Sequence, residues 1–266
     1  MIGCQFCGST DIASSTRATG WIDYRCKGCG RKNKPVELGG SNNILFIGDV
    51  HLPFVHKDYL NFLKDVKEQY DVTDNNTYCV GDIVDNHASS FHQTDVNGMS
   101  AGDELDYTRS LIQEWGEAFP KMKIAFGNHD QIPARQLAAS GLPRDFLRNI
   151  KEVYNMPDGW DFRHEWSVGN AKLIHGTGFS GMYAHATAAR GTMGNVILGH
   201  LHSVAGVHYI ASDSKLIYGL SCGCGVDRDS YAMAYGKYFP RKPILGCGLL
   251  LNGKIPIFIP MDLGEK

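Results

Sequence analysis

Five short blocks of this chain supply oxygen or imidazole donors, although no two of them adjoin in the sequence. The blocks are Gly48-Asp49-Val50-His51, Gly81-Asp82-Ile83-Val84-Asp85-Asn86, Gly127-Asn128-His129-Asp130, His175-Gly176 and Gly199-His200-Leu201-His202. Mixed carboxylate, amide and imidazole donors suit borderline first-row ions, Mn²⁺ foremost, with Fe²⁺, Zn²⁺ or Ni²⁺ as alternatives. The blocks therefore predict ligands for two divalent metal ions.

The spacing within and before the blocks indicates how the donors converge. Asp49 and His51 are two residues apart, and alternate residues of an extended segment share one face. His200 and His202 repeat this spacing. Apolar runs that read as buried strands precede most blocks, and a glycine stands before four of them, where it permits a sharp turn and close approach to a ligand. We expect the donors at the ends of sheet strands.

The apolar periodicity predicts the elements that position these blocks. Strands near 43–47, 77–81 and 122–127 alternate with helices near 58–69 and 103–118, an order typical of a parallel sheet covered by helices. A further helix is predicted over 133–150. After residue 160 we expect a second, mixed sheet, with strands near 162–168, 171–175, 195–198, 204–210, 215–220, 246–251 and 255–260 and one helix over 182–190. The predicted fold class is α/β (α+β), with two packed mixed sheets flanked by helices.

Residues 1–36 differ from the rest. Cys4-x-x-Cys7 and Cys26-x-x-Cys29 are separated by eighteen residues, the spacing of a four-cysteine zinc ribbon that holds one structural Zn²⁺. So small a unit would draw much of its folding energy from the metal. A pair of redox-active Cys-x-x-Cys motifs is the alternative. We expect a ribbon over 1–36, a linker over 37–42 and a catalytic domain over 43–266.

Bulk composition limits the location and the partners. The chain has 266 residues, of which 43% are hydrophobic, enough for one sizeable core. Its net charge is −2, so bulk charge does not indicate binding to polyanions. No run approaches the roughly 20 apolar residues that span a bilayer, so no membrane partner is predicted. Paired cysteines at metal spacing and the lack of a secretory signal pattern favour an intracellular, cytoplasmic location.

The five blocks resemble the signature of the calcineurin-like metallophosphoesterase superfamily: D-x-H, G-D-x-x-D, G-N-H-[D/E], H and G-H-x-H. The resemblance runs from residue 49 to 202 in the family's order. It implies that Asp49, His51, Asp82 and His202 hold the first ion and that Asp82 bridges to the second. The other ligands of the second ion would be Asn128, His175 and His200. The layout also resembles uncharacterised bacteriophage phosphoesterases.

The resemblance implies metal-assisted hydrolysis of a phosphoester. Two ions roughly 3.5–4 Å apart would polarise the phosphoryl oxygens and lower the pKa of a bridging water, whose hydroxide attacks phosphorus. His129 would be the catalytic histidine that binds no metal and protonates the leaving oxygen. Asp85 would orient His129.

Two departures from the family pattern narrow the substrate. The protein Ser/Thr phosphatase branch has an arginine where Asn86 stands and a glutamate where Asp130 stands, which weakens a protein-phosphatase interpretation. Isolated histidines such as His87 and His92 are by default structural, although one of them could line the cleft. Cys222 and Cys224 fit zinc spacing poorly, and we predict a tight glycine-rich loop there, near the active-site face.

The N-terminal segment bears on the substrate. Residues 1–36 contain six Lys and Arg residues but only two acidic residues, and Trp21 and Tyr24 lie between the cysteine pairs. Basic and aromatic side chains together are typical of a segment that binds nucleic acid. The first hypothesis is thus a phosphodiesterase or nuclease acting on DNA or RNA. The second is a phosphomonoesterase or small-nucleotide phosphodiesterase whose ribbon contacts a protein. The third is a non-catalytic metal-binding scaffold, which the complete ligand set disfavours. The oligomeric state is not predicted.

Overall fold

The computed structural model describes residues 2–3, 9, 11–16, 22–29, 31, 36–37, 42–91, 94–236 and 240–263. The chain divides into two compact units, Met1–Asn42 and Asn43–Lys266. No helix in these ranges is long and apolar enough to cross a membrane.

The first unit contains two small antiparallel pairs. Strand β1 (Ile2–Gly3) pairs with β4 (Val36–Glu37), and β2 (Ile12–Thr16) pairs with β3 (Ile22–Cys26). Glu37, placed in the predicted linker, therefore pairs with Ile2 inside this unit. Cys4 and Cys7 lie outside the described residues, so the four-cysteine zinc ribbon stays a prediction.

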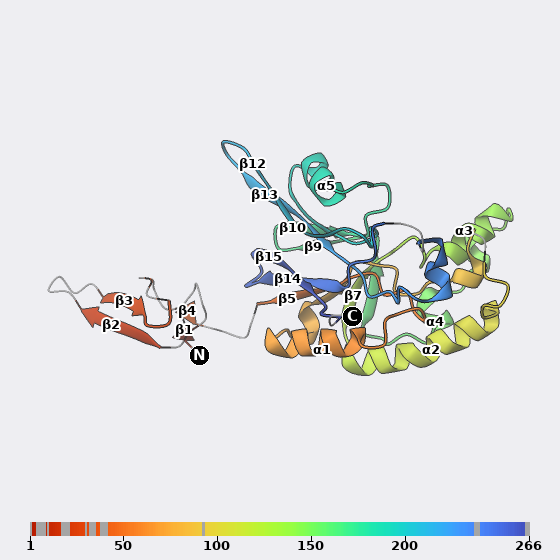
Figure 1. Cartoon of the computed structure of the whole chain (residues 1–266), viewed down its shortest axis with the longest axis horizontal. Coiled ribbons are helices and arrows are strands. Elements are labelled where there is room, and N and C mark those ends of the chain that lie inside the picture. The colour runs from red at the N-terminus through yellow and green to blue at the C-terminus, as the bar shows by residue number, and fades with distance from the viewer. Residues whose placement is uncertain are drawn as a thin grey trace. The chain divides into compact units, whose positions relative to one another are not determined.

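The second unit contains two mixed sheets, as predicted (Figure 1). The strands at 246–251 and 255–260, predicted in the second sheet, belong instead to the larger one, because the first of them pairs with the strand at 44–47. The larger has the order β15-β14-β5-β6-β7-β8 and the smaller the order β12-β13-β11-β10-β9. The strands of the larger sheet are β5 (Ile44–Ile47), β6 (Thr77–Cys79), β7 (Met122–Ala125), β8 (Trp160–Arg163), β14 (Gly246–Leu251) and β15 (Ile255–Pro260). Those of the smaller are β9 (Glu165–Val168), β10 (Ala171–Ile174), β11 (Asn195–Leu198), β12 (Ala205–Ala211) and β13 (Leu216–Cys222).

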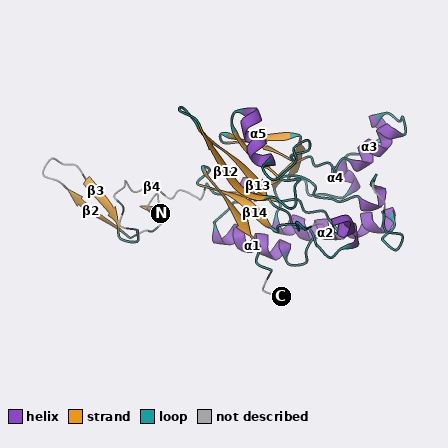
Figure 2. Cartoon of the chain, turned by 45° about the horizontal axis from the view of Figure 1, so that its top comes forward, coloured by secondary structure: helices purple, strands orange, loops and turns teal. Residues whose placement is uncertain are grey.

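Helices cover the outer faces of both sheets, which gives four layers (Figure 2). Helices α1 (Tyr59–Gln69) and α2 (Ala101–Ala118) pack on the larger sheet, and α5 (Ala184–Thr192) packs on the smaller one. The four residues of β5 are all buried, because Leu45 and Ile47 face the helices while Ile44 and Phe46 face the other sheet. This burial on both faces explains the unbroken apolar runs.

The predicted helix over 133–150 is wrong. The segment forms α3 (Ile132–Ala139), a 3₁₀ turn at Arg144–Phe146 and the short α4 (Ile150–Val153). Gly141 has a φ of +72°, which ends the helical path, and Pro143 disfavours helix in the residue before it. Asn149 then starts α4 by accepting a hydrogen bond from the backbone N–H of Lys151.

The single strand predicted over 162–168 is also wrong. It consists of two strands on either side of His164, and β8 belongs to the larger sheet whereas β9 belongs to the smaller. Trp160 packs under the helices, while Trp166 packs between the sheets. The chain therefore crosses from one sheet to the other at this point.

Candidate metal centre

The five blocks converge at the carboxyl ends of strands from both sheets. Asp49 and His51 follow β5, Asp82 and Asp85 follow β6, and Asn128 and His129 follow β7. His175 follows β10, and His200 and His202 follow β11. Strands β5, β6 and β7 are parallel to one another, as are β10 and β11, so in each sheet the donors emerge at one edge. That edge is where ligands bind in parallel sheets.

The first group of donors consists of Asp49, His51 and His202, whose ligand atoms lie within 4.8 Å of one another. His202 Nε2 lies 3.0 Å from His51 Nε2 and 3.2 Å from Asp49 Oδ2. Ligands about 2.1 Å from a metal ion lie roughly 3 Å apart when they subtend a right angle at it. Asp49 Oδ1 is buried and has no hydrogen-bond partner among the described residues, which fits a cation-binding carboxylate.

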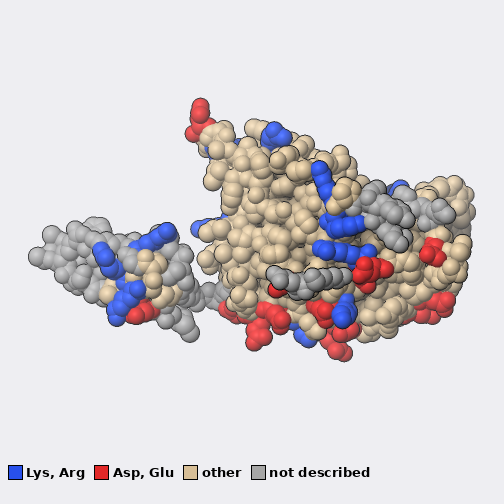
Figure 3. All heavy atoms as spheres, in the orientation of Figure 1, with Lys and Arg blue, Asp and Glu red and all other residues tan. Residues whose placement is uncertain are grey.

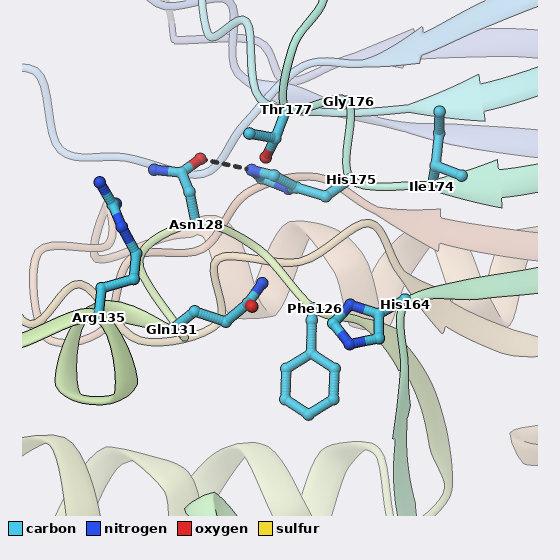
Figure 4. A pocket seen from close by; sticks show the side chains of 9 residues that line it. All are labelled: Phe126, Asn128, Gln131, Arg135, His164, Ile174, His175, Gly176 and Thr177. Atoms are coloured by element: carbon cyan, nitrogen blue, oxygen red, sulfur yellow. Dashed lines mark hydrogen bonds between the residues drawn. The ribbon is translucent and has the colours of Figure 1, made fainter. Parts of the chain in front are cut away.

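The second group consists of Asp82, His175 and His200. His175 Nδ1 hydrogen-bonds to the backbone oxygen of Val80 at 3.0 Å, which leaves Nε2 to face the group. Nε2 lies 3.2 Å from Asp82 Oδ2 and 3.0 Å from Asn128 Oδ1 (Figure 4). Three acceptor atoms at such distances repel one another unless positive charge lies among them.

Electrostatics give the same picture. Burial alone would lower the pKa of His175, but the charge of Asp82 and the hydrogen bond to it raise this pKa to about 10. Burial would raise the pKa of Asp82, yet the histidines around it hold this pKa well below its ordinary value. The group thus attracts positive charge strongly, and its donor set fits divalent ions.

Asp82, a member of the second group, also faces the first. Its Oδ2 is 3.5 Å from His51 Nε2 and 3.2 Å from His175 Nε2. The structure thus brings all seven predicted ligands together, with Asp82 where a bridging carboxylate is expected. Their assignment to individual ions remains a prediction.

Asp85 lies beside the centre and contacts two histidines. Its Oδ1 is 2.6 Å from His51 Nδ1 and 2.9 Å from His129 Nδ1. The first contact sets the tautomer of His51 so that Nε2 faces the first group, as outer carboxylates do for metal-bound histidines. Burial favours the neutral form of Asp85, but the hydrogen bonds from His129 and His51 hold its pKa below the ordinary value.

His129 is held by its backbone and by one ring nitrogen. Its N–H donates to Asp82 Oδ1 at 2.8 Å, and Nδ1 lies 2.7 Å from the backbone oxygen of Asp85. The side chain is a quarter exposed. Burial would lower the pKa of His129, but the hydrogen bond with Asp85 and the charge of Asp82 raise it to about 9. Nδ1 is occupied, so Nε2 is the nitrogen available for substrate.

Several ligands sit on strained backbone. His51, Asp82 and His200 have φ values of 57°, 48° and 69°, a left-handed conformation that costs residues other than glycine of order 1–3 kcal/mol each. Such strain persists only where the surroundings hold it, and it concentrates at functional sites.

The glycines before the blocks have a role beyond the predicted one, in which Gly81, with a φ of +115°, makes a turn open to glycine. A Cβ on Gly127 would lie 2.0 Å from Asp82 Oδ1, and one on Gly199 would lie 2.2 Å from Asp49 Oδ1. These glycines permit neighbouring ligand loops to approach each other, in addition to any approach of a bound group.

Sequence reasoning missed the role of Asp130. Its buried carboxylate accepts backbone N–H groups from Gly127, Asp82, Ile83 and Val84 at 2.8–3.2 Å, and so ties two ligand loops together. Burial and the charge of Asp82 raise the pKa of Asp130 to about 6. The acid after Asn128-His129 was visible in the sequence, but its partners were not.

Asn86 and Tyr154 form a second brace. Asn86 Nδ2 donates to the backbone oxygen of His129 at 3.0 Å, and its Oδ1 accepts the hydroxyl of Tyr154 at 2.6 Å. Asn86 therefore supports His129 at the position where protein phosphatases have arginine. Tyr154 is 68 residues away, and no local pattern connects the two.

Sequence predictions were also made for two histidines outside the ligand set and for the segment around Cys222 and Cys224. His87 lies in edge contact with Phe54 and Tyr231, and its Nδ1 is 3.9 Å from Asp85 Oδ2. His92 lies outside the described residues. Cys222 and Cys224 are buried, and the backbone N–H of Gly225 donates to Asp49 O at 2.7 Å, so the glycine-rich loop borders the site as predicted.

A pocket of about 550 Å³ opens beside Asn128 and His175 (Figure 4). Its lining includes Phe126, Gln131, Arg135, His164 and Thr177. His164 was among the isolated histidines expected to be structural, and the others were not singled out from the sequence, because they come from separate segments and match no motif. On one face of the second unit, acidic side chains gather along the edge that α1 and α2 form, and Lys and Arg side chains form a row above them (Figure 3).

The comparison with known protein families agrees with this geometry. Residues 43–209 match the family model described as calcineurin-like phosphoesterase. The chain belongs to the calcineurin-like phosphoesterase family. A search of curated proteins found no match. Calcineurin-like phosphoesterases are metal-dependent hydrolases of phosphoester bonds, and the two donor groups provide for that chemistry here. The match begins at residue 43, so the zinc ribbon and the similarity to bacteriophage enzymes stay predictions.

Proposed function

We propose that this calcineurin-like phosphoesterase is a phosphodiesterase that cleaves nucleic acid. The observation that carries the proposal is the position of the pocket relative to His129. His129 adjoins the first donor group through Asp85 and His51, whereas the pocket adjoins the second through Asn128 and His175. A phosphodiester carries two substituents on its phosphorus. One would leave on the side of His129, and the other would lie in the pocket.

The residues of the chain would divide the work as follows. Two divalent ions would polarise a phosphoryl group and supply a nucleophile from water at neutral pH. The residues that would hold them are Asp49, His51, Asp82, Asn128, His175, His200 and His202. His129 would carry a proton on Nε2 to the leaving oxygen. Asp85 keeps that ring turned toward the substrate and favours its charged form. Mn²⁺ is the proposed native metal because oxygen donors contribute beside the imidazoles.

Charge supports a polyanionic substrate. Residues 1–36 are rich in Lys and Arg for their length, and a row of basic side chains crosses one face of the catalytic unit (Figure 3). Contacts between such side chains and phosphates supply most non-specific affinity for nucleic acids. The ribbon is proposed as the handle and the centre as the site of cleavage.

Cleavage assays test the proposal directly. The full-length, Mn²⁺-loaded protein would be incubated with end-labelled single- and double-stranded DNA and RNA, and with chromogenic phosphate mono- and diesters. We expect cleavage of at least one nucleic acid and a kcat/KM for the diester at least about tenfold above that for the monoester. The Asp82→Asn protein, purified identically, controls for a contaminating nuclease. Monoester hydrolysis without nucleic-acid cleavage would favour the phosphomonoesterase hypothesis.

The ribbon is tested within the full chain. Replacing Lys32 and Lys34 by glutamine should reduce the slope of log K against log salt by about 1.5, since each lost phosphate contact removes about 0.7–0.9. Hydrolysis of the chromogenic diester should stay unchanged. An unchanged salt slope would instead leave the ribbon as a protein-contact module.

A further inference from the structure

We propose that Arg135 binds a non-scissile phosphate, the one next to the phosphate under attack, so that the pocket accepts a continuing phosphodiester chain. The inference rests on the proposed function and specifies its substrate: a strand with a second phosphate on the pocket side. Nothing in the sequence motifs of the centre involves this arginine.

The position of Arg135 carries the first step. Arg135 lies in α3, directly after the block that contains Asn128 and His129. It lines the pocket that starts at Asn128 and His175. In Figure 4 its side chain extends from the helix along the same side of the pocket as Asn128. The guanidinium thus stands at the exposed side of a pocket whose inner end is the metal centre.

The contacts of Arg135 carry the second step. Its Cζ lies 5.0 Å from the centroid of the Phe91 ring, and Phe91 is half exposed. Among the described residues Arg135 makes no ion pair with a carboxylate, unlike Arg109 and Arg163, which contact Asp106 and Asp161. A stacked guanidinium is held in place while its N–H groups remain available, and this geometry suits bidentate binding of phosphate.

The support beneath the pair indicates a built surface. Gln136 Nε2 donates to the backbone oxygen of Ser89 at 2.8 Å, which links α3 to the segment that carries Phe91. Gln131 Nε2 donates to the backbone oxygen of Gly127 at 3.1 Å, which links α3 to the Asn128 loop. Arg135 and Phe91 are therefore held at a set distance from the metal ligands.

The other groups of the site indicate that Arg135 binds the neighbouring phosphate rather than the scissile one. The scissile phosphate belongs at the donor groups, next to His129. The position where protein phosphatases carry an arginine is occupied by Asn86, which is engaged by His129 and Tyr154. On the pocket side, the rings of Phe126 and His164 lie 5.3 Å apart and line the wall. They lie on the side of the pocket away from Arg135 (Figure 4) and provide a surface for the base of the nucleoside that joins the two phosphates.

Binding measurements test the inference without requiring turnover. Isothermal titration of the full-length, Mn²⁺-loaded protein would use inorganic phosphate, thymidine 5′-monophosphate, thymidine 3′-monophosphate and thymidine 3′,5′-bisphosphate. The wild type should bind the bisphosphate at least about tenfold more tightly than either monophosphate. Arg135→Ala should reduce this ratio to about two or below. Arg135→Lys, which keeps the charge but not the planar fork, should give an intermediate ratio.

Control variants and other outcomes separate this inference from the proposed function. Arg144→Ala removes an exposed arginine outside the pocket lining and should keep the wild-type ratio. The affinity for inorganic phosphate should change less than twofold in Arg135→Ala. An equal loss for inorganic phosphate, or an unchanged ratio, would overturn the inference. A protein that shows the Arg135-dependent ratio but cleaves no nucleic acid would contradict the proposed function and leave the second phosphate site standing.

Discussion

The carboxylate of Asp130 accepts the backbone N–H of Asp82, with Oδ2 3.0 Å from the nitrogen. The predicted bridging ligand is therefore held in place by a residue that is not one of the seven predicted ligands. The same oxygen accepts the N–H of Gly127, next to the ligand Asn128. One side chain thus sets the distance between two ligand loops that are 45 residues apart in the chain.

Asp130→Asn is expected to loosen these loops. The amide group would place N–H donors against backbone N–H groups and leave some of them unpaired, at a cost of about 3 kcal/mol. Chemical denaturation should show this loss, and metal analysis of the purified protein should show reduced occupancy. Asp145→Asn, an exposed change outside the centre, should leave both values near wild type. Full stability and full occupancy in Asp130→Asn would refute the bracing role.

Gly199→Ala tests the close approach of two other ligand loops. The added Cβ would lie 2.2 Å from Asp49 Oδ1 and 2.4 Å from Val80 Cγ2, so that the loops must separate, at a cost of about 1–3 kcal/mol. We expect lower metal occupancy together with lower stability. Gly191→Ala is the matched control, because nothing lies within 4 Å of its Cβ position and it sits in α5. There alanine should be neutral or stabilising by about 0.5–1 kcal/mol.

The positions of the ligands could be predicted because most donor blocks directly follow an apolar run. A buried strand ends at its last apolar residue, so the polar residues beyond it must lie at the edge of the sheet. The break within 133–150 has its own signals in the chain, Gly141 and Pro143, although the apolar spacing alone predicts one helix across them. In contrast, the alternation that includes Trp160 and Trp166 continues through His164, and only tertiary packing shows that these tryptophans face different layers.

The supporting residues could not be predicted for a related reason. Asp130, Tyr154 and Arg135 act through partners that the fold brings near, and neither the type of residue nor its neighbours in sequence reveal them. Asp130 contacts backbone N–H groups 46 to 48 residues away, and backbone groups leave no trace in a sequence pattern. A motif identifies groups that meet the metal, whereas the groups that hold those ligands require coordinates.

His129→Asn separates catalysis from metal binding. His129 contacts Asp85, which in turn contacts the predicted ligand His51. Loss of the His129 imidazole should reduce turnover about 10²- to 10⁴-fold, the usual contribution of a general acid. Metal occupancy should remain near wild type. Asp82→Asn should instead lose metal occupancy, and turnover with it, because the charge of the predicted bridging carboxylate is removed. His208→Asn, an exposed histidine of β12, controls for histidine loss in general. Equal metal loss in His129→Asn and Asp82→Asn would disprove the separation.

Tyr154→Phe tests whether His129 depends on support from a distant side chain. The buried hydroxyl donates to Asn86 Oδ1 at 2.6 Å, and Asn86 in turn donates to His129 O. Without the hydroxyl, Asn86 loses its restraint, and the loss of one such hydrogen bond costs about 1 kcal/mol. Turnover should fall several-fold while KM and metal occupancy change little, because the ligands and the pocket are untouched. Steady-state kinetics and metal analysis of the same preparation measure this split.

Tyr218→Phe provides the matched control for that change. Tyr218 is also buried, but its hydroxyl has no hydrogen-bond partner among the described residues, and it packs between the sheets rather than beside His129. Removing an unpaired buried hydroxyl should leave turnover unchanged and stability equal or higher. If both phenylalanine variants lose turnover to the same extent, the effect of Tyr154 is general packing. If only Tyr154→Phe loses turnover and its metal is retained, Asn86 positions His129, which explains why this chain keeps asparagine where protein phosphatases have arginine.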